Sequence, residues 1–336
     1  MKITYFNNLS DETKADIDAF LSIWQDDSDL VKIKTSGSTG VPKEIELQKS
    51  AMLNSAKLTG QFFDFKPGQK NLLALSPNHI AGIMQIVRAW QFDMELLVAP
   101  VVSNPLKIVK NESFDFAAFV PFQVEAILKD DSSTIIYESI RNVIIGGAPI
   151  HQQLEAAINK CSNQNYATFG MTETISHIAL RNIKTSSTLY KGLESVHFNK
   201  DKRGCLIINA SHIGEGEVVT NDCVDLIDDS SFVWLGRVDH VINSGGIKIH
   251  PEQVEIKLKS VLLDNRFYIT KEKSDSFGEQ VVLVVEGSQW SGEDYTHYNA
   301  EIKKALGKFE QPKRVIFITQ FQETPTGKLI KLLPKD

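Results

Sequence analysis

Four short apolar segments, each followed by a turn and a helical pattern, constrain the fold of this chain most. They lie at residues 71–75, 96–98, 116–120 and 142–145. Apolar strands that alternate with helices are typical of a largely parallel sheet covered by helices. Because the carboxyl ends of parallel strands meet at one edge of a sheet, we expect functional loops to follow these strands. The sequence therefore predicts a layered α/β domain with its site at that edge.

The flanking regions complete the expected organisation. The first 30 residues are expected to be helical and acidic, with Ser10 or Asp11 as the N-cap, and 48–63 to form an amphipathic helix. From about residue 192 the chain changes to short β-like runs. Beyond residue 239 a helix is expected at 251–262, followed by strands at 281–285 and 314–318. We predict an α/β fold with a large N-terminal domain (1–238) that includes a β-rich subdomain, and a small α+β C-terminal domain (239–336).

Composition excludes several classes of function. The 336 residues carry a net charge of −6, so no basic excess is present for general binding of nucleic acid. No apolar run approaches the roughly 20 residues of a membrane span, and the N-terminus lacks the pattern of a signal peptide. The three cysteines form no CxxC pair. We expect a cytoplasmic protein that neither binds nucleic acid nor inserts into a membrane.

One loop, Thr35-Ser36-Gly37-Ser38-Thr39-Gly40-Val41-Pro42-Lys43, is suited to binding a polyphosphate. Its glycines let the backbone approach an anion, its amides and hydroxyls donate hydrogen bonds, and its lysine adds a positive charge. It is not a Walker A loop, because Pro42 and Glu44 stand where that motif needs glycine and Ser or Thr. Taken alone, the same segment is equally compatible with a surface turn.

Four further motifs follow in order: GGAP at 146–149, FGMTET at 169–174, GRVDHVINSGGIKIHPEQVE at 236–255 and TPTGK at 324–328. Together with the loop at 35–43, they resemble the adenylate-forming superfamily of acyl-CoA ligases, peptide-synthetase adenylation domains and firefly luciferase. The resemblance implies activation of a carboxylic acid by ATP and Mg²⁺. The small domain is then expected to rotate about Asp239 and open a path for the thiol of CoA, for which Lys248, Gly245 and Gly246 are the candidate contacts.

The resemblance also implies roles for individual residues. Lys328 bridges the carboxylate and the α-phosphate, Glu173 holds Mg²⁺, and Thr172 belongs with them to the catalytic set. Asp222 accepts hydrogen bonds from the ribose, with Arg237 beside it. The residues implied to bind the nucleotide are Thr35, Ser36, Gly37, Ser38, Thr39, Gly40, Lys43, Gly147, Ala148, Pro149, Phe169, Gly170, Asp222 and Arg237.

The chain also departs from the superfamily pattern. Phe169 replaces the usual tyrosine, Asn221 replaces the glycine of TGD, and Cys205 stands at the glutamate position of GEL. Family members carry more sequence before the phosphate loop, so we expect a shortened first subdomain. The sequence is compatible with a homodimer, since a shortened subdomain would expose an apolar patch that two copies can bury.

This brevity, with the wording GGAPI and SGGIKIHPEQVE, most resembles shortened 2-succinylbenzoate–CoA ligases of menaquinone synthesis. Such an enzyme converts 2-succinylbenzoate, ATP and CoA to 2-succinylbenzoyl-CoA, AMP and diphosphate. We expect the acid to contact His79, Arg88 and His177, with Arg88 pairing the second carboxylate. Arg88 as a helix-surface charge and His177 as a packed core histidine are the structural alternatives.

Three functions therefore compete on sequence alone. The first is the dicarboxylate-specific ligase. The second is a ligase for another aryl or fatty acid, or one that loads a carrier protein. The third is a catalytically dead relative that only binds nucleotide, against which the presence of Lys43, Glu173, Asp222, Arg237 and Lys328 argues.

Overall fold

The computed structural model describes residues 1–7, 9–34, 44–109, 112–185, 187–214, 216–263, 265–322 and 329–334. The loop at 35–43 and the motif at 324–328 lie outside these ranges. The predictions for Thr35, Ser36, Gly37, Ser38, Thr39, Gly40, Lys43 and Lys328 therefore fall outside the described residues. No helix in the described part of the chain is long and apolar enough to cross a bilayer.

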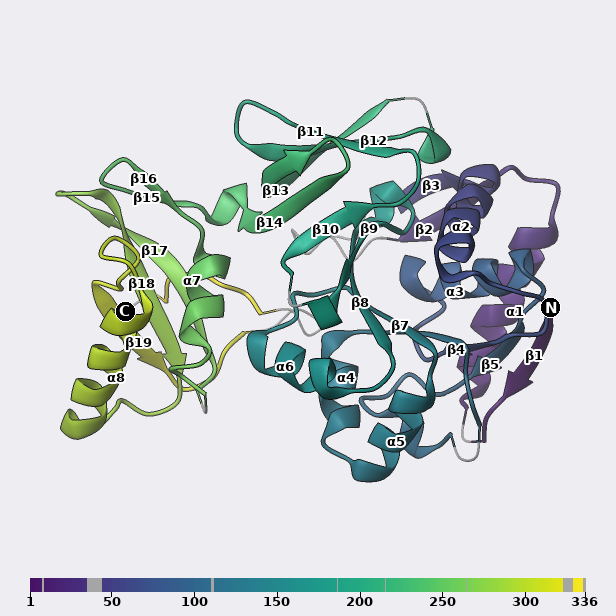
Figure 1. The fold of residues 1–336 in the computed structure, drawn as a ribbon, viewed down its shortest axis with the longest axis horizontal. Helices are drawn as coiled ribbons and strands as arrows, with labels where there is room; N and C mark the ends of the chain where they lie inside the picture. The colour runs from purple at the N-terminus through teal and green to yellow at the C-terminus, as the bar shows by residue number, and fades with distance from the viewer. Residues whose placement is uncertain are drawn as a thin grey trace.

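A twelve-stranded sheet runs through the large part of the molecule (Figure 1). Its strands pair in parallel from β1 to β8 and antiparallel from β8 onward. The order is β1 (Lys2–Tyr5), β5 (Glu95–Val98), β4 (Lys70–Leu73), β6 (Phe116–Phe119), β7 (Asn142–Ile145), β8 (Gln164–Gly170), β9 (His177–Asn182), β10 (Leu189–Gly192), β14 (Ser231–Arg237), β13 (Glu217–Asp228), β12 (Cys205–Ala210) and β11 (Val196–Lys200). The predicted layered α/β fold with its β-rich extension is confirmed.

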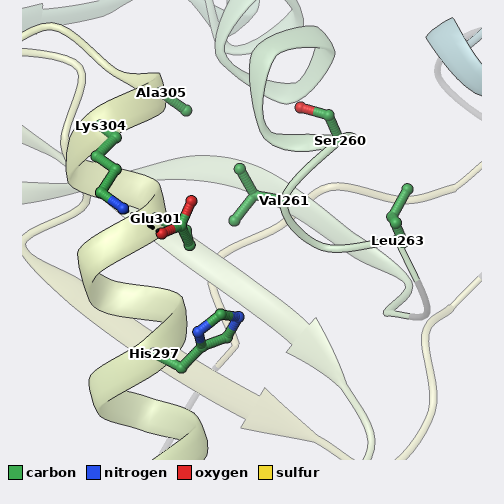
Figure 2. A pocket seen from close by; sticks show the side chains of 7 residues that line it. All are labelled: Ser260, Val261, Leu263, His297, Glu301, Lys304 and Ala305. Carbon is green, nitrogen blue, oxygen red and sulfur yellow. Dashed lines mark hydrogen bonds and ion pairs between the residues drawn. The ribbon is translucent and has the colours of Figure 1, made fainter.

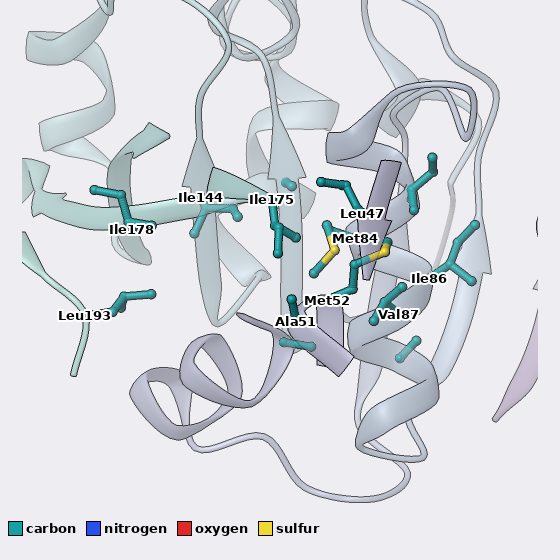
Figure 3. Packing of buried hydrophobic residues seen from close by; sticks show 14 of the residues in the cluster. Leu47, Ala51, Met52, Met84, Ile86, Val87, Ile144, Ile175, Ile178 and Leu193 are labelled. Carbon is teal, nitrogen blue, oxygen red and sulfur yellow. The ribbon is translucent and has the colours of Figure 1, made fainter. Parts of the chain in front are cut away.

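Helices cover both faces of the parallel part. Strand side chains alternate between faces, so Phe116 and Ile144 belong to one hydrophobic cluster while Phe119 and Ile145 belong to another. The first cluster, shown in part in Figure 3, also holds buried residues of three N-terminal helices. These are α1 (Asp11–Gln25), α2 (Lys49–Phe63) and α3 (Ile80–Gln91). The second cluster is covered by α4 (Pro121–Leu128), α5 (Asp131–Ser139) and α6 (Gln152–Lys160).

The C-terminal part has its own sheet and core, and it stands apart from the large sheet in Figure 1. Its elements are β15 (Ile242–Ser244), β16 (Ile247–Ile249), α7 (Pro251–Leu258), β17 (Phe267–Ser274), β18 (Gly278–Glu286), α8 (Gly292–Ala305) and β19 (Arg314–Ile318). A hairpin of β2 (Leu30–Lys34) and β3 (Glu44–Gln48) forms a third, two-stranded sheet. Residue 239, our proposed domain boundary, lies in the short 3₁₀ helix η5 (Val238–His240) between the two larger sheets.

Two predictions of secondary structure were wrong in part. The first 30 residues are not helical throughout, because Lys2–Tyr5 pairs with β5 as an edge strand before α1 begins at Asp11. Ser10 is the N-cap of α1, and its Oγ accepts from the Thr13 amide at 3.2 Å. The helix expected at 251–262 ends earlier, at Leu258.

Candidate active site

The turn that follows β7 packs closely against β8. A Cβ at Gly146 would lie 2.2 Å from Thr168 Oγ1, so a side chain at this position would force Thr168 to move. Gly147 has a φ of +85°, a conformation that glycine adopts without strain. The exposed Ala148 and Pro149 complete this turn. The structure therefore places the predicted adenine-binding turn beside β8, at the carboxyl end of two parallel strands.

The connection from β8 to β9 is a tight turn that contains the 3₁₀ helix η2 (Thr172–Thr174). A Cβ at Gly170 would lie 2.3 Å from the Ser176 carbonyl oxygen, so the turn folds back on itself. Thr174 Oγ1 accepts from the Met171 amide at 2.9 Å, and Ile175 has a φ of +66°. A β-branched residue in this region is strained, a feature that clusters at functional sites. Glu173 is exposed on this turn and Thr172 is half-buried.

The aromatic face of Phe169 packs beside the turn. Its ring meets that of Phe232 edge-to-face, with the ring centroids 5.0 Å apart, and that of Tyr190 with the centroids 6.0 Å apart. Phe169 is half-buried, so part of its ring stays accessible. The described residues contain no group of three or more His, Cys, Asp or Glu side chains that could hold a metal. A lone exposed carboxylate at Glu173 fits a magnesium ion that takes its other ligands from nucleotide oxygens.

Asp222 lies within β13 and is buried. Its Oδ1 accepts from Trp234 Nε1 at 2.9 Å, and its Oδ2 lies 3.8 Å from Arg237 Nη1. Burial raises the pKa of this carboxyl, while Trp234 and Arg237 act in the opposite direction. Arg237 also donates to Asp239 Oδ2 at 3.1 Å, and Asp239 is exposed. The structure therefore links the predicted ribose ligand, its arginine and the predicted hinge in one chain of contacts.

Contacts on either side of the predicted hinge hold α7 against β14. Gln253 Nε2 donates to the main-chain oxygens of Trp234 and Leu235 at 3.1 and 3.0 Å. His240 Nδ1 lies 2.6 Å from Glu252 Oε1. Lys248, Gly245 and Gly246 lie in the exposed β15–β16 hairpin on the small part.

Arg88 lies in the last turn of α3 and is 2% exposed. Its Nη1 donates to Gln85 Oε1 at 3.1 Å, and its Nη2 donates to Ser176 Oγ. Its Nε has no hydrogen-bond partner, and no carboxylate forms an ion pair with it, among the residues that the structure describes. Burial lowers the pKa of this guanidinium to about 9. Arg88 is therefore a buried cation, not the helix-surface charge that sequence allowed.

His177 lies next to this arginine. It begins β9, is 6% exposed, and its Nδ1 lies 3.3 Å from Ser176 Oγ. Its Nε2 lies 3.3 Å from Thr59 Oγ1 on α2. Burial lowers the pKa of His177 well below its usual value, and the positive charge of Arg88 lowers it further. The ring is therefore neutral and accepts or donates within a polar interior cluster.

His79 is not part of this cluster. It is the N-cap of α3 and is exposed, and Arg88 follows nine residues later, about 13 Å along a helix axis. Ser176, Gln85 and Thr59 are the cluster members that sequence reasoning missed. A signal was present for Gln85, which interrupts the apolar run of α3 three residues before Arg88 and so shares its helix face.

A surface hollow of about 490 Å³ lies elsewhere, on the small part between α8 and the residues after α7 (Figure 2). It is lined by Ser260, Val261, Leu263, His297, Glu301, Lys304 and Ala305. Glu301 and Lys304 pair with each other at 2.6 Å. None of the predicted site residues in the described ranges lines this hollow.

Comparison with known proteins shows the family of this chain. The AMP-binding enzyme family matches residues 8–196. An acyl-CoA synthetase (AMP-forming)/AMP-acid ligase II-like protein of Dyadobacter fermentans is 33% identical, with coverage of 97% of this chain and 94% of that chain and a TM-score of 0.66.

Two further similarities are more distant. The 2-succinylbenzoate–CoA ligase of Haemophilus influenzae is 24% identical over 299 residues, which are 83% of this chain and 64% of that relative. The Bacillus subtilis o-succinylbenzoate CoA synthetase, solved in complex with the acyl-adenylate intermediate OSB-AMP, is 20% identical. The match covers 89% of this chain and 67% of that one, with a TM-score of 0.74. This chain thus spans about two thirds of the length of these two relatives.

Proposed function

This chain belongs to the AMP-binding enzyme family, and from that premise we propose that it is an AMP-forming acid–CoA ligase. In the proposed first step a carboxylate oxygen attacks the α-phosphorus of ATP and displaces diphosphate. In the second step the sulfur of CoA attacks the acyl carbon, the thiol loses its proton, and AMP leaves. The ligase names of the curated relatives support this assignment.

Residues of the described site suit the nucleotide half of the reaction. The glycine turn at Gly147 gives a purine close access to the backbone, and the half-buried ring of Phe169 offers it a face. Asp222 is buried, and a buried carboxylate is costly unless it is hydrogen-bonded. It would accept hydrogen bonds from the ribose hydroxyls. Glu173 would hold Mg²⁺, which neutralises phosphate charge when bound. The roles of Lys43 and Lys328 rest on the resemblance of their motifs.

The acid that we propose is 2-succinylbenzoate, in a cytoplasmic route to menaquinone. One observation carries the choice of a dicarboxylate: the buried Arg88 faces no carboxylate among the described residues. A buried charge is costly unless a counter-charge and hydrogen bonds compensate it. The second carboxylate of the substrate would supply both, through the guanidinium donor at Nε that is still free in the described part of the chain. A monocarboxylate would leave this cost in place.

A diphosphate-release assay tests the function. It combines ATP, Mg²⁺ and CoA with 2-succinylbenzoate, benzoate, a medium-chain fatty acid or a D-amino acid. We expect turnover with 2-succinylbenzoate and little with the others. Turnover of a different acid alone would discard the proposed substrate and keep the ligase chemistry. Silence with every acid, despite measurable binding of ATP, would favour a relative that only binds nucleotide.

Substitution of Arg88 tests its role directly. Arg88→Met should lower kcat/KM for 2-succinylbenzoate by about 100-fold, since removing a buried charged partner costs several kcal/mol. The exposed Arg141 provides a matched control, and Arg141→Met should leave kcat/KM within about twofold. An Arg88→Met enzyme with an unchanged KM for 2-succinylbenzoate would remove Arg88 from the substrate site.

A further inference from the structure

The guanidinium of Arg88 is held by a chain of buried amides that no motif includes. Gln85 and Asn71 are both fully buried at 0% exposure. Gln85 lies one turn before Arg88 on α3, and Asn71 lies on β4 beneath that helix. Buried polar side chains in an apolar core are costly unless every group is paired. The cost of burying Gln85 and Asn71 between the central sheet and Arg88 therefore needs a functional explanation.

The hydrogen bonds fix which way each amide faces. Gln85 Nε2 donates to Asn71 Oδ1 at 3.0 Å and to the Leu72 carbonyl oxygen at 3.4 Å. Asn71 Nδ2 donates to the Gln85 carbonyl oxygen at 3.0 Å. If the Gln85 amide were reversed, its oxygen would face two acceptors and its NH₂ group would face the donors of Arg88. Only one orientation satisfies the network, and it presents Oε1 to Arg88 Nη1 at 3.1 Å.

This arrangement fixes the guanidinium plane without neutralising it. Gln85 Oε1 is a neutral acceptor, and so is Ser176 Oγ, which accepts from Nη2. The two contacts come from different elements, α3 and the residue before β9. A planar guanidinium held at both terminal nitrogens has one orientation, while its positive charge stays available to a ligand.

We infer that Gln85, oriented by Asn71, is the positioning residue that aims Arg88 at the second carboxylate of a dicarboxylate substrate. The inference rests on the proposed function and names residues that set its selectivity. Gln85 acts through Arg88 and touches no reacting atom. A glutamate at this position would instead pair with Arg88 and compete with the substrate.

The test compares 2-succinylbenzoate with the monoacids that each keep one of its carboxylates, 4-oxo-4-phenylbutanoate and 2-butanoylbenzoate. Gln85→Met should lower the ratio of kcat/KM for the diacid to kcat/KM for the monoacid that is turned over. We expect a fall of about 10- to 100-fold, mostly through KM for the diacid, because a hydrogen bond to a charged group is lost. Gln85→Glu keeps the size and the acceptor, and it should raise KM for the diacid at least as much.

Gln123 provides the matched control. It is 4% exposed, and among the described residues its Nε2 donates to the carbonyl oxygens of Ala74 and Val102, at 2.9 and 3.1 Å. Gln123→Met removes a buried amide without touching Arg88, so it should lower the thermal midpoint and leave the diacid-to-monoacid ratio within about twofold. Gln85→Glu carries the test if Gln85→Met does not fold.

The outcomes separate this inference from the function on which it rests. A ratio that is unchanged in both Gln85 variants, or that falls equally in Gln123→Met, would overturn the positioning role. If Arg88→Met still abolished diacid selectivity in that case, the proposed function would stand. Wild-type protein that turns over no dicarboxylate would overturn both the positioning role and the proposed substrate.

Discussion

Two arginines with nearly equal burial meet the same strand in opposite ways. Arg181, within β9, is 7% exposed, and its two terminal nitrogens donate to Glu155 on α6 at 2.6 and 2.8 Å. Arg88, which contacts the residue before β9, is 2% exposed and has two neutral acceptors. Burial lowers the pKa of both guanidinium groups, but Glu155 and Tyr190 more than reverse this at Arg181, so its pKa is raised.

We propose that the difference separates a structural cation, Arg181, from a cation that binds a ligand, Arg88. Glu155 neutralises Arg181 within the fold, and the Ser187 carbonyl oxygen accepts a further bond at 3.1 Å. This pair ties α6 to the sheet. At Arg88, two neutral acceptors orient the guanidinium, and no carboxylate among the described residues pairs with it. A buried charge that lowers stability and is nevertheless held in one orientation by hydrogen bonds is a candidate functional residue.

The largest effect should follow from breaking the paired arginine. Arg181→Met leaves Glu155 without its partner, and we expect the free energy of unfolding to fall by about 3 kcal/mol. The cost of leaving the Glu155 carboxylate unpaired is reduced because its side chain is 25% exposed and can be solvated. Urea unfolding followed by circular dichroism measures the change. A more stable Arg181→Met protein would contradict the structural role.

A change in stability of the opposite sign is expected at Arg88. Arg88→Met removes, at nearly constant volume, a buried charge that no carboxylate among the described residues compensates, so the free energy of unfolding should rise by about 1–2 kcal/mol. The loss of the contacts to Gln85 and Ser176 limits the gain. The same urea titration measures it, and the assay above shows the cost in activity. A loss of stability as large as that in Arg181→Met would show that both arginines are structural.

The histidine beside Arg88 should make the unfolding free energy depend on pH. Its folded pKa lies well below the unfolded value of about 6.5. Below pH 6.5 His177 binds a proton in the unfolded chain but not in the folded chain. The free energy of unfolding therefore falls as the pH falls. The groups that face His177 are Arg88, Ser176, Thr59 and His212. His177→Gln should remove about 1 kcal/mol of the loss between pH 7 and 5.5. Parallel pH profiles of the two proteins would contradict this.

The fold could largely be predicted because its signals are local. The apolar segments at 71–75, 96–98, 116–120 and 142–145 alternate with helices, and each became a parallel strand. Strand β1 was missed since four residues carry little pattern, and its partner β5 lies about 90 residues further along the chain. Local propensity cannot report such a pairing.

The site could be predicted only where a motif marks it. The glycines at 146, 147 and 170 stand where a side chain would clash or a positive φ is needed, and that requirement is written in the sequence. The burial of Arg88 could not be predicted from the sequence, because one of its contacts is Ser176, which is 88 residues away. The same holds for Arg181, whose partner Glu155 lies 26 residues away. Both arginines interrupt apolar runs, so sequence alone could not tell the arginine that is ion-paired within the fold from the one for which we propose a ligand.

The smallest predicted effect concerns salt, and it sharpens the contrast between a buried pair and a surface pair. Between 0.1 and 1 M NaCl, the stability difference between wild type and Arg181→Met should change by less than about 0.5 kcal/mol, because bulk ions screen buried charges poorly. Lys32 pairs with Glu44 and Glu46 at 3.5 Å, with more than half of its side chain exposed. Lys32→Met is therefore the surface reference, and the small effect expected of an exposed pair should vanish in high salt. Urea titrations at both concentrations measure the two differences. If salt erased the Arg181 effect as well, the Arg181–Glu155 pair would behave as a surface contact. The difference in ion pairing between the two arginines would then no longer explain their opposite effects on stability.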